Sequence, residues 1–195
     1  MPTKINLINN IYQPAEDSFL LQEQVRLFWK KRRIRKAIDM GTGTGIQAIE
    51  ASKFSGEVLA VDINEGALNI ARKNIEKKAI KNIKLIKSNL FGRIPKQKFD
   101  LIIFNPPYLP EEDNQQDKQQ KSPVVDGGKK GHEVIELFLG QARNYLANGG
   151  AILLLFSTLT GDVEAVMKKQ NYKFKKLAEE KLFMEKLFVY ELRQF

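Results

Sequence analysis

Apolar residues along this chain fall into two alternating kinds of run. Short apolar runs predict buried strands, and longer runs with apolar positions three and four apart predict amphipathic helices. Strands are expected at 37–40, 57–61, 83–87, 99–104 and 151–156, a hairpin at 172–177 and 186–192, and helices at about 15–30, 46–54, 65–78, 132–147 and 161–170, with a break at Gly149 and Gly150. Strands that alternate with helices predict an α/β fold: a doubly wound, mostly parallel seven-stranded sheet with an antiparallel C-terminal hairpin strand.

The strand expected at 99–104 ends in Asn105-Pro-Pro-Tyr108. Proline lacks an N–H and holds the preceding residue extended, so Asn105 and Pro106 are expected at the sheet rim with carbonyls outside the strand ladder. The Asn105 side-chain oxygen and the Pro106 carbonyl can then accept from one NH2 group, while Tyr108 offers a flat face. We call this arrangement the NH2 site. It suits a carboxamide or the exocyclic amine of a base, and it makes Asn105, Pro106 and Tyr108 candidate catalytic residues. The alternative is a polar turn that only closes the strand and has no role in binding or catalysis.

A glycine-rich loop, Gly41-Thr-Gly-Thr-Gly45, follows the strand expected at 37–40 and precedes a helix. Glycines let the backbone approach a ligand at a helix N-terminus, the geometry used for nucleotide-like cofactors. Asp62 follows about 20 residues later, where an acidic residue grips a ribose diol. If the strands that end before this loop and before Asn105 flank the point where the strand order reverses, both motifs face one crevice.

Composition limits the compartment and the partners. At 195 residues, a single domain over 1–195 is expected. Cysteine is absent, as are an apolar signal segment and a membrane-length apolar run, so we expect a cytoplasmic protein with no membrane span. The net charge of +9 favours a nucleic-acid or ribosomal neighbour, or equally reflects a lysine-rich, thermophile-like surface. The basic run from Trp29 to Lys36 is expected at the solvated end of the first helix, with an RNA-binding or partner-binding patch as the alternative.

Asn105-Pro-Pro-Tyr108 and the glycine loop resemble motifs of the class I S-adenosylmethionine-dependent amino-methyltransferases, not the Gly-x-Gly-x-x-Gly of nicotinamide enzymes. The resemblance implies a class I methyltransferase (Rossmann-like) fold, S-adenosylmethionine as cofactor, and no metal. It implies that Asp39 and Gly41 lie along the methionine end of the cofactor and that Asp62 binds the ribose. Ser88-Asn89-Leu90-Phe91 matches the segment whose acidic residue takes the adenine amino group. Here Asn89 stands in that place, and its amide oxygen can accept the same bond.

Tyr12-Gln-Pro-Ala-Glu-Asp-Ser-Phe-Leu-Leu21 and Asp126-Gly-Gly-Lys-Lys-Gly-His-Glu-Val134, taken with the two motifs above, resemble the short archaeal and eukaryotic HemK-type protein-glutamine methyltransferases. The resemblance implies methylation of the glutamine amide nitrogen in the Gly-Gly-Gln loop of a class I release factor. The cofactor-binding residues it implies are Ser18, Asp39, Gly41, Gly43, Gly45, Asp62, Asn89, Leu90 and Asn105. Bacterial relatives carry an extra N-terminal substrate domain, for which the 38 residues before Asp39 leave no room.

Short forms of this family work with a small zinc-binding activator protein, and the resemblance implies such a partner here. The strand expected at 83–87 would lie at a sheet edge, where a partner strand can add. The alternative is a solitary edge that Lys84 and Lys87 protect from pairing. The polar segment 111–121 is expected to form a long loop beside the NH2 site.

Two other functions stay open at this stage. An adenine-N6 methyltransferase acting on RNA or DNA would use the same NH2 site, although the length leaves no room for a separate target-reading domain. A non-catalytic cofactor-binding subunit is the third reading, and the intact Asn-Pro-Pro-Tyr argues against it. The single histidine, His132, is expected to be incidental.

Overall fold

One seven-stranded sheet runs through the part of the chain that the computed structural model describes, which is residues 7–8, 11–28, 34–107 and 131–195. Its strands lie in the order β5-β4-β3-β6-β7-β9-β8. Their bounds are β3 Ile34–Met40, β4 Ser55–Asp62, β5 Ile83–Lys87, β6 Phe99–Phe104, β7 Leu146–Ser157, β8 Tyr172–Lys181 and β9 Lys186–Gln194. The first five strands in this order pair in parallel, and β9 runs antiparallel to both β7 and β8. The predicted fold class is confirmed.

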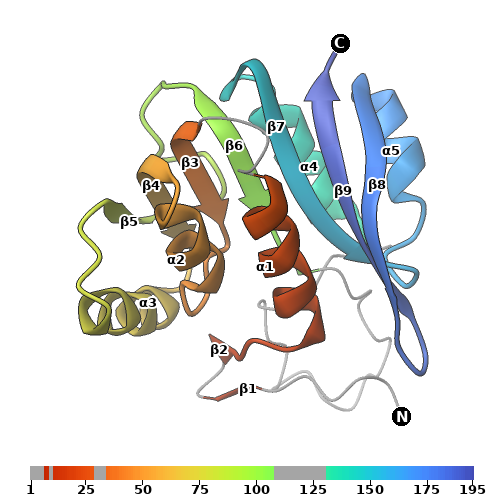
Figure 1. Cartoon of the computed structure of the whole chain (residues 1–195). Helices are drawn as coiled ribbons and strands as arrows, with labels where there is room; N and C mark the ends of the chain where they lie inside the picture. The colour runs from red at the N-terminus through yellow and green to blue at the C-terminus, as the bar shows by residue number, and fades with distance from the viewer. Residues whose placement is uncertain (1–6, 9–10, 29–33, 108–130) are drawn as a thin grey trace.

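Helices cover both faces of this sheet (Figure 1). The helices are α1 Glu16–Phe28, α2 Ile46–Ser52, α3 Glu65–Lys77, α4 Glu133–Ala142 and α5 Val163–Lys169, and a short ribbon of β1 Leu7–Ile8 and β2 Ile11–Tyr12 precedes α1. Helices α1 and α2 bury apolar side chains against one face, and α4 and α5 do so against the other. None of the helices in these described ranges has the length and apolarity needed to span a lipid bilayer.

Strand β6 is buried on both faces from Leu101 to Phe104, which explains the apolar run there. Leu101 and Ile103 join the core cluster under α1 and α2, whereas Ile102 and Phe104 join the cluster under α4 and α5. Side chains alternate between the two faces of a strand, so an apolar residue is needed at each of these four positions.

The strand order reverses between β3 and β6. From β3 the chain adds β4 and β5 on one side, and it then returns to place β6 on the other side of β3. Asp39 lies opposite Ile103 and Met40 opposite Phe104 in the parallel register. The ends of both strands therefore meet at one edge of the sheet, as the sequence predicted for a doubly wound fold.

Three local predictions were wrong. The helix expected at 132–147 ends at Ala142, and Leu146 and Ala147 already belong to β7. The Gly149-Gly150 pair lies inside β7, where the register jumps from Phe99 opposite Leu146 to Leu101 opposite Ala151; this is a bulge, and Gly149 takes a φ of +73° in it. The segment 34–36, expected at the solvated end of the first helix, instead begins β3, because Asp100 accepts hydrogen bonds from the backbone N–H groups of residues 35 and 36 at 2.8 and 3.0 Å. Residues 29–33 of the basic run lie outside the described residues.

The turn from β3 into α2 requires glycine at position 45. Gly45 has a φ of +87°, and a Cβ placed there would lie 3.3 Å from the Cβ of Ala71 in α3. We expect Gly45→Ala to lower the free energy of unfolding by about 1–3 kcal/mol, because the left-handed conformation is strained for alanine and the contact is tight. Urea denaturation followed by circular dichroism measures the change.

Gly140 in α4 is the matched control. It has no left-handed φ, and its added Cβ would lie 3.7 Å from Gln170, in ordinary contact. Gly140→Ala should leave the free energy of unfolding unchanged or raise it by up to about 1 kcal/mol, because alanine favours a helix interior. Equal losses for both variants would contradict the conformational explanation.

Candidate functional site

Asn105 lies directly after β6 with its carboxamide fixed by one hydrogen bond. Its Nδ2 donates to Oδ2 of Asp17, in the first turn of α1, at 2.9 Å. Its Oδ1 is buried and has no hydrogen-bond partner among the described residues. The predicted acceptor is therefore present at the end of β6 as an unpaired oxygen. Tyr108, the aromatic member of the predicted NH2 site, lies outside the described residues, as does the segment 111–121.

The glycine loop lies against the end of β6. Gly41, Gly43 and Gly45 all take left-handed φ values, of +63°, +54° and +87°. A Cβ on Gly41 would lie 3.5 Å from the Phe104 ring and 3.9 Å from the Asn105 carbonyl oxygen. Glycine at 41 thus keeps the space between the two motifs open.

Asp39 is a buried carboxyl group at the end of β3. Its Oδ2 accepts from the Thr42 hydroxyl at 2.5 Å and from the Ala48 backbone N–H at 3.0 Å. Burial raises the pKa of Asp39 to about 7; the two hydrogen bonds oppose this shift, and the nearby charge of Asp62 adds to it. A cation beside Asp39 would favour its ionised form.

Asp62 orders the backbone on both sides of the crevice. Its Oδ2 accepts from the Gly43 N–H at 2.9 Å, and its Oδ1 accepts from the Asn64 N–H at 2.8 Å. Burial raises the pKa of Asp62, and the backbone hydrogen bonds counteract the shift. Each carboxylate oxygen keeps further lone-pair capacity, so Asp62 can also accept from a diol.

The segment after β5 forms the next wall of the crevice. Ser88 accepts at its Oγ from the Arg93 N–H at 2.9 Å, which closes a turn around Asn89 and Leu90. Leu90 takes a left-handed φ of +44°. The Asn89 side chain is exposed, so its amide oxygen is accessible from the crevice.

Helix α1 adds Ser18 and Asp17, and α2 adds Gln47; the sequence motifs did not indicate Asp17 or Gln47 as site residues. Ser18 is buried, and its carbonyl accepts from Nε2 of Gln47 at 2.8 Å; Oε1 of Gln47 is buried and unpaired within the described residues. Asp17 holds Asn105, as described above. Asp17 lies inside the conspicuous segment 12–21, but its partner Asn105, directly after β6, is 88 positions away, and no local spacing indicates such a contact.

These residues surround one cavity of about 690 Å³ at the carboxyl ends of β3 and β6. The predicted residues that line it are Ser18, Asp39, Gly41, Gly43, Asp62, Asn89, Leu90, Asn105 and Pro106. Gly45 is not among the lining residues; it lies at the start of α2, as the N-cap residue of that helix. The structure thus brings the predicted residues of five separate segments to one place.

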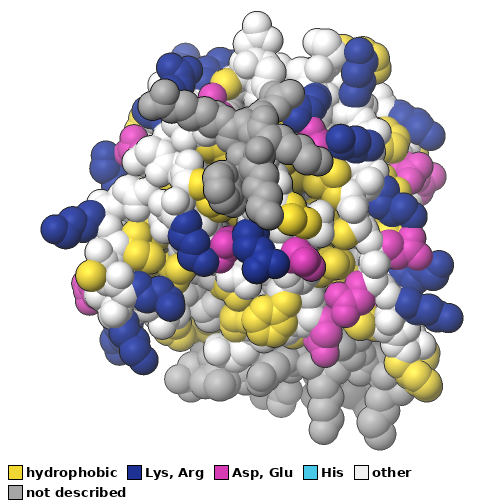
Figure 2. All heavy atoms as spheres, in the orientation of Figure 1, with side chains coloured by type: hydrophobic (Ala, Val, Ile, Leu, Met, Phe, Trp, Pro, Cys, Tyr) yellow, Lys and Arg dark blue, Asp and Glu magenta, His cyan; other side chains and the backbone are white. Residues whose placement is uncertain are grey.

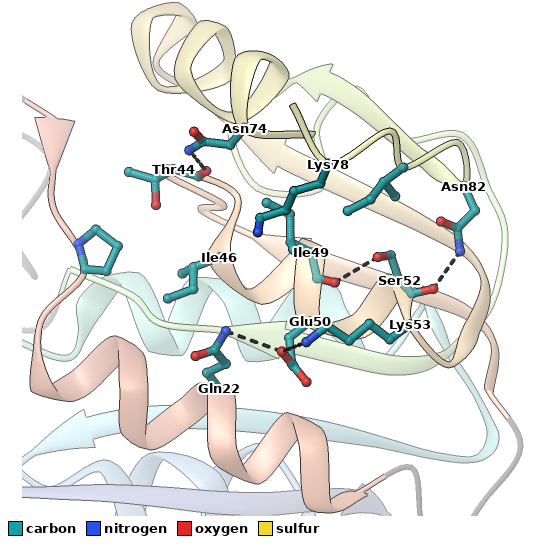
Figure 3. A pocket seen from close by; sticks show the side chains of 12 residues that line it. Gln22, Thr44, Ile46, Ile49, Glu50, Ser52, Lys53, Asn74, Lys78 and Asn82 are labelled. Atoms are coloured by element: carbon teal, nitrogen blue, oxygen red, sulfur yellow. Dashed lines mark hydrogen bonds and ion pairs between the residues drawn. The ribbon is translucent and has the colours of Figure 1, made fainter. Parts of the chain in front are cut away.

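A second cavity of about 700 Å³ lies on the outer side of the glycine loop, between α1, α2 and α3 (Figure 3). Its polar groups bind one another. Glu50 pairs with Lys53 at 2.5 Å and accepts from Gln22 at 3.4 Å, and Asn74 donates to the Thr44 carbonyl at 2.9 Å. The hydrogen bond from Asn74 holds the glycine loop on the side away from the first cavity. We therefore assign this second cavity a structural role.

The arrangement can hold an extended, nucleotide-like molecule beside a planar NH2 group. Glycine backbone and Asp62 fit a ribose and its neighbours, the buried Asp39 fits a cation, and the unpaired Asn105 oxygen fits an N–H donor. An unpaired buried acceptor costs stability, so its presence in a cavity points to a ligand that supplies the donor.

Comparison with known proteins adds a family and relatives. The family described as Methyltransferase small domain matches residues 19–184. A protein of Methanocaldococcus jannaschii, named as a candidate protein N5-glutamine methyltransferase, is 35% identical over 88% of this chain and 85% of its own length. The release factor glutamine methyltransferase of Escherichia coli is 32% identical over 79% of this chain; the match spans 57% of that protein's length.

Solved structures share the fold. The complex of Mtq2 and Trm112 from E. cuniculi, responsible for methylation of the termination factor eRF1, contains a chain that matches with a TM-score of 0.72 and 23% identity over 95% of this chain and 99% of that one. The Thermus thermophilus 16S rRNA N2 G1207 methyltransferase, solved with AdoMet and guanosine, matches with a TM-score of 0.71 and 20% identity over 94% of this chain and 44% of that one.

The buried carboxyl group of Asp39 predicts a pH-dependent cost. The folded chain keeps this proton up to about pH 7, whereas an unfolded aspartate loses it near pH 3.8. The stability that Asp39 contributes is therefore full below about pH 4 and is lost as the pH rises toward 7. Asp39→Asn removes the titration, so its stability relative to the natural chain should rise by about 1–4 kcal/mol between pH 4 and 8.

Urea denaturation of both proteins at a series of pH values measures this difference. Glu23→Gln, on the exposed face of α1, is the control for the loss of one carboxyl group. A difference between Asp39→Asn and the natural chain that stays constant from pH 4 to 8 would show that Asp39 is ionised at all these values.

Proposed function

This chain belongs to the methyltransferase small domain family, and we propose that it is a cytoplasmic, single-domain S-adenosylmethionine-dependent enzyme that methylates the glutamine amide nitrogen of the Gly-Gly-Gln loop of a class I release factor. The observation that carries the proposal is the buried, unpaired Oδ1 of Asn105, a residue that lines the 690 Å³ cavity. The relatives named as glutamine methyltransferases support the choice of acceptor group.

The chain's own residues would hold S-adenosylmethionine along the cavity. Asp39, Gly41 and Ser18 are assigned to the methionine end, where the positive ammonium group would stabilise the ionised form of Asp39. Asp62 is assigned to the ribose hydroxyls, and Asn89 with Leu90 to the adenine. Gly43 and Gly45 keep the loop in the left-handed conformation that leaves room for the cofactor.

The cofactor would supply an electrophilic methyl group and leave as its thioether, and the methylated nitrogen would lose one of its protons to solvent after transfer. The protein therefore needs no strong base to create the nucleophile. Asn105 Oδ1 and the Pro106 carbonyl accept the two N–H bonds of the glutamine amide, and this fixes the direction of its nitrogen. Both acceptors also stabilise the positive charge that develops on the nitrogen during transfer. Such orientation supplies roughly 7 kcal/mol or more of the barrier reduction in well-aligned reactions. Tyr108 is proposed to cover the flat face of the amide.

The lining of the cavity favours a protein substrate over a nucleic acid. Its described lining contains acidic residues, among them Asp17, Asp39 and Asp62, and no lysine or arginine. Nucleic-acid binding rests chiefly on cations placed against phosphates. On the face shown in Figure 2, Lys and Arg are scattered among acidic and apolar side chains and do not gather into one stripe. The net charge of +9 is thus not focused at the described walls of the cavity.

A small partner protein, which we propose to be a zinc-binding activator, would dock on β5. This strand is an edge of the sheet and pairs only with β4 among the described strands. The carbonyl of Asn82 accepts a hydrogen bond from β4, and the N–H of Ser88 donates one to β4. Backbone groups alternate in direction along a strand, so those of the even-numbered residues point toward β4 and those of residues 83, 85 and 87 point outward. Lys84 and Lys87 pair with Glu57 and Glu65, which leaves less free charge to repel a partner strand.

Methyl transfer tests the proposed function. We expect labelled methyl transfer from S-adenosylmethionine to the Gly-Gly-Gln glutamine of the cognate release factor, located by mass spectrometry. Asn105→Ala should lower kcat by about 10²–10³-fold, the loss seen when one preorganised hydrogen-bonding group is removed, while cofactor affinity changes little. Asn69→Ala, an exposed asparagine of α3, is the matched control. Label in tRNA, rRNA or DNA with an unmodified glutamine would instead establish the adenine reading.

The edge strand offers a separate test of the partner. Lys87→Pro removes one outward N–H, whereas Lys87→Ala removes the same side chain and its pair with Glu65 but keeps the N–H. We expect Lys87→Pro to weaken association with a small zinc-binding activator at least tenfold in calorimetry, and Lys87→Ala to bind within about twofold of the natural chain, because exposed ion pairs contribute little. Equal binding of all three would rule out strand addition at β5.

A further inference from the structure

We propose that Asp17 is a positioning residue that decides which atom of Asn105 faces the substrate. This inference rests on the proposed function and adds a residue to the same site. Asp17 belongs to α1, whereas Asn105 follows β6 and contacts the substrate nitrogen. We propose that Asp17 acts on the reaction through Asn105.

Asp17 is held in place on both of its oxygens. It is 4% exposed. Its Oδ1 accepts from the Tyr12 hydroxyl and from the Ser18 backbone N–H, both at 2.5 Å, and its Oδ2 accepts from Nδ2 of Asn105 at 2.9 Å. All three of these partners donate a hydrogen bond to a carboxylate oxygen. Tyr12 and the helix backbone fix the carboxylate, and the carboxylate in turn fixes Asn105.

This contact leaves the Asn105 carboxamide only one orientation. A carboxylate has acceptors and no donor, so only the NH2 end of an amide can bind it. Rotation of the Asn105 amide by 180° would place its oxygen against the Asp17 oxygen, with two acceptors in contact and the NH2 group turned into the cavity. The orientation of the Asn105 amide is therefore fixed, because the Asp17 carboxylate can accept only from the amide nitrogen.

The fixed orientation determines what the cavity can accept. With Nδ2 bound to Asp17, Oδ1 is the atom left for the substrate, and it is buried and unpaired within the described chain. A substrate NH2 group satisfies this oxygen. With the amide reversed, two donors would oppose each other and the nitrogen of the substrate would be repelled. The Asn105 carboxamide has both a donor and an acceptor, and Asp17 leaves only the acceptor for the substrate.

The alternative role for Asp17 is purely structural. Glu16 and Asp17 are both acidic residues of the first turn of α1, where negative charge stabilises a helix. That role predicts a loss of stability when Asp17 is neutralised and no selective loss of kcat. The two roles therefore predict different kcat values for a double variant in which Asp17 and Asn105 are both substituted.

Exchange of the two side chains is the decisive experiment. Asp17→Asn frees the Asn105 amide to rotate, and we expect kcat for release-factor methylation to fall about 10–100-fold with cofactor Kd within twofold. Asn105→Asp places two carboxylates in contact, and we expect a loss of at least 100-fold. In the double variant, the new amide at 17 can donate to the new carboxylate at 105, whose other oxygen still accepts from the substrate. We expect its kcat to exceed that of Asn105→Asp at least tenfold.

Glu23→Gln in α1 controls for the loss of a negative charge from that helix, and urea denaturation verifies that every variant is folded at the assay temperature. A natural kcat in Asp17→Asn, or a double variant no better than Asn105→Asp, would overturn the inference. Failure of the proposed function is distinct from these results. If the natural chain methylates nucleic acid and not the release factor, the same four kcat values on that substrate decide the role of Asp17.

Discussion

The parallel pairing of β3 with β6 is the constraint on which the site depends. Each strand ends in a segment that cannot continue a ladder: a glycine loop with left-handed residues after β3, and a proline pair after β6. Because the strands are in register up to Met40 and Phe104, the two endings start at the same height and face one cavity. A shift of one residue in this register would turn Asp39 away from the cavity edge and into the apolar core.

This geometry concentrates carboxyl groups where burial opposes their charge. Asp39 is the extreme case, with a pKa raised to about 7, and the pKa of Asp62 is raised as well. A domain selected for stability alone would place neutral groups there. The hydrogen bonds from Thr42 and Gly43 offset part of the cost and also shape the loop. A cation beside Asp39 would favour its ionised form and offset the remaining cost, so the proposed function would couple cofactor binding to stability through this carboxyl group.

Much of the fold could be predicted because it rests on local signals. The apolar run 101–104 indicated a doubly buried strand, and the prolines fixed its end. The irregular register of β7 could not be predicted in this way, because glycines at 149 and 150 indicate a loop and extra residues within a strand equally well; only the pairing with β6 decides. Similarly, Arg35 and Lys36 are charged and indicate a solvated segment, but Asp100, from another segment, binds their backbone N–H groups at the start of β3.

The same distinction separates the residues of the site. Asn105, Asp62 and the glycines carry a signature in their own neighbourhood, so sequence reasoning reached them. Asp17 and Gln47 have no such signature, because each acts through a tertiary hydrogen bond to another segment. Both are amide-to-acceptor contacts that join α1 to the site. Helix α1 therefore does more than cover the sheet: it sets the orientation of the amides that face the cavity. A motif specifies which groups are present, and the helix packed across it specifies which of their atoms are available for chemistry.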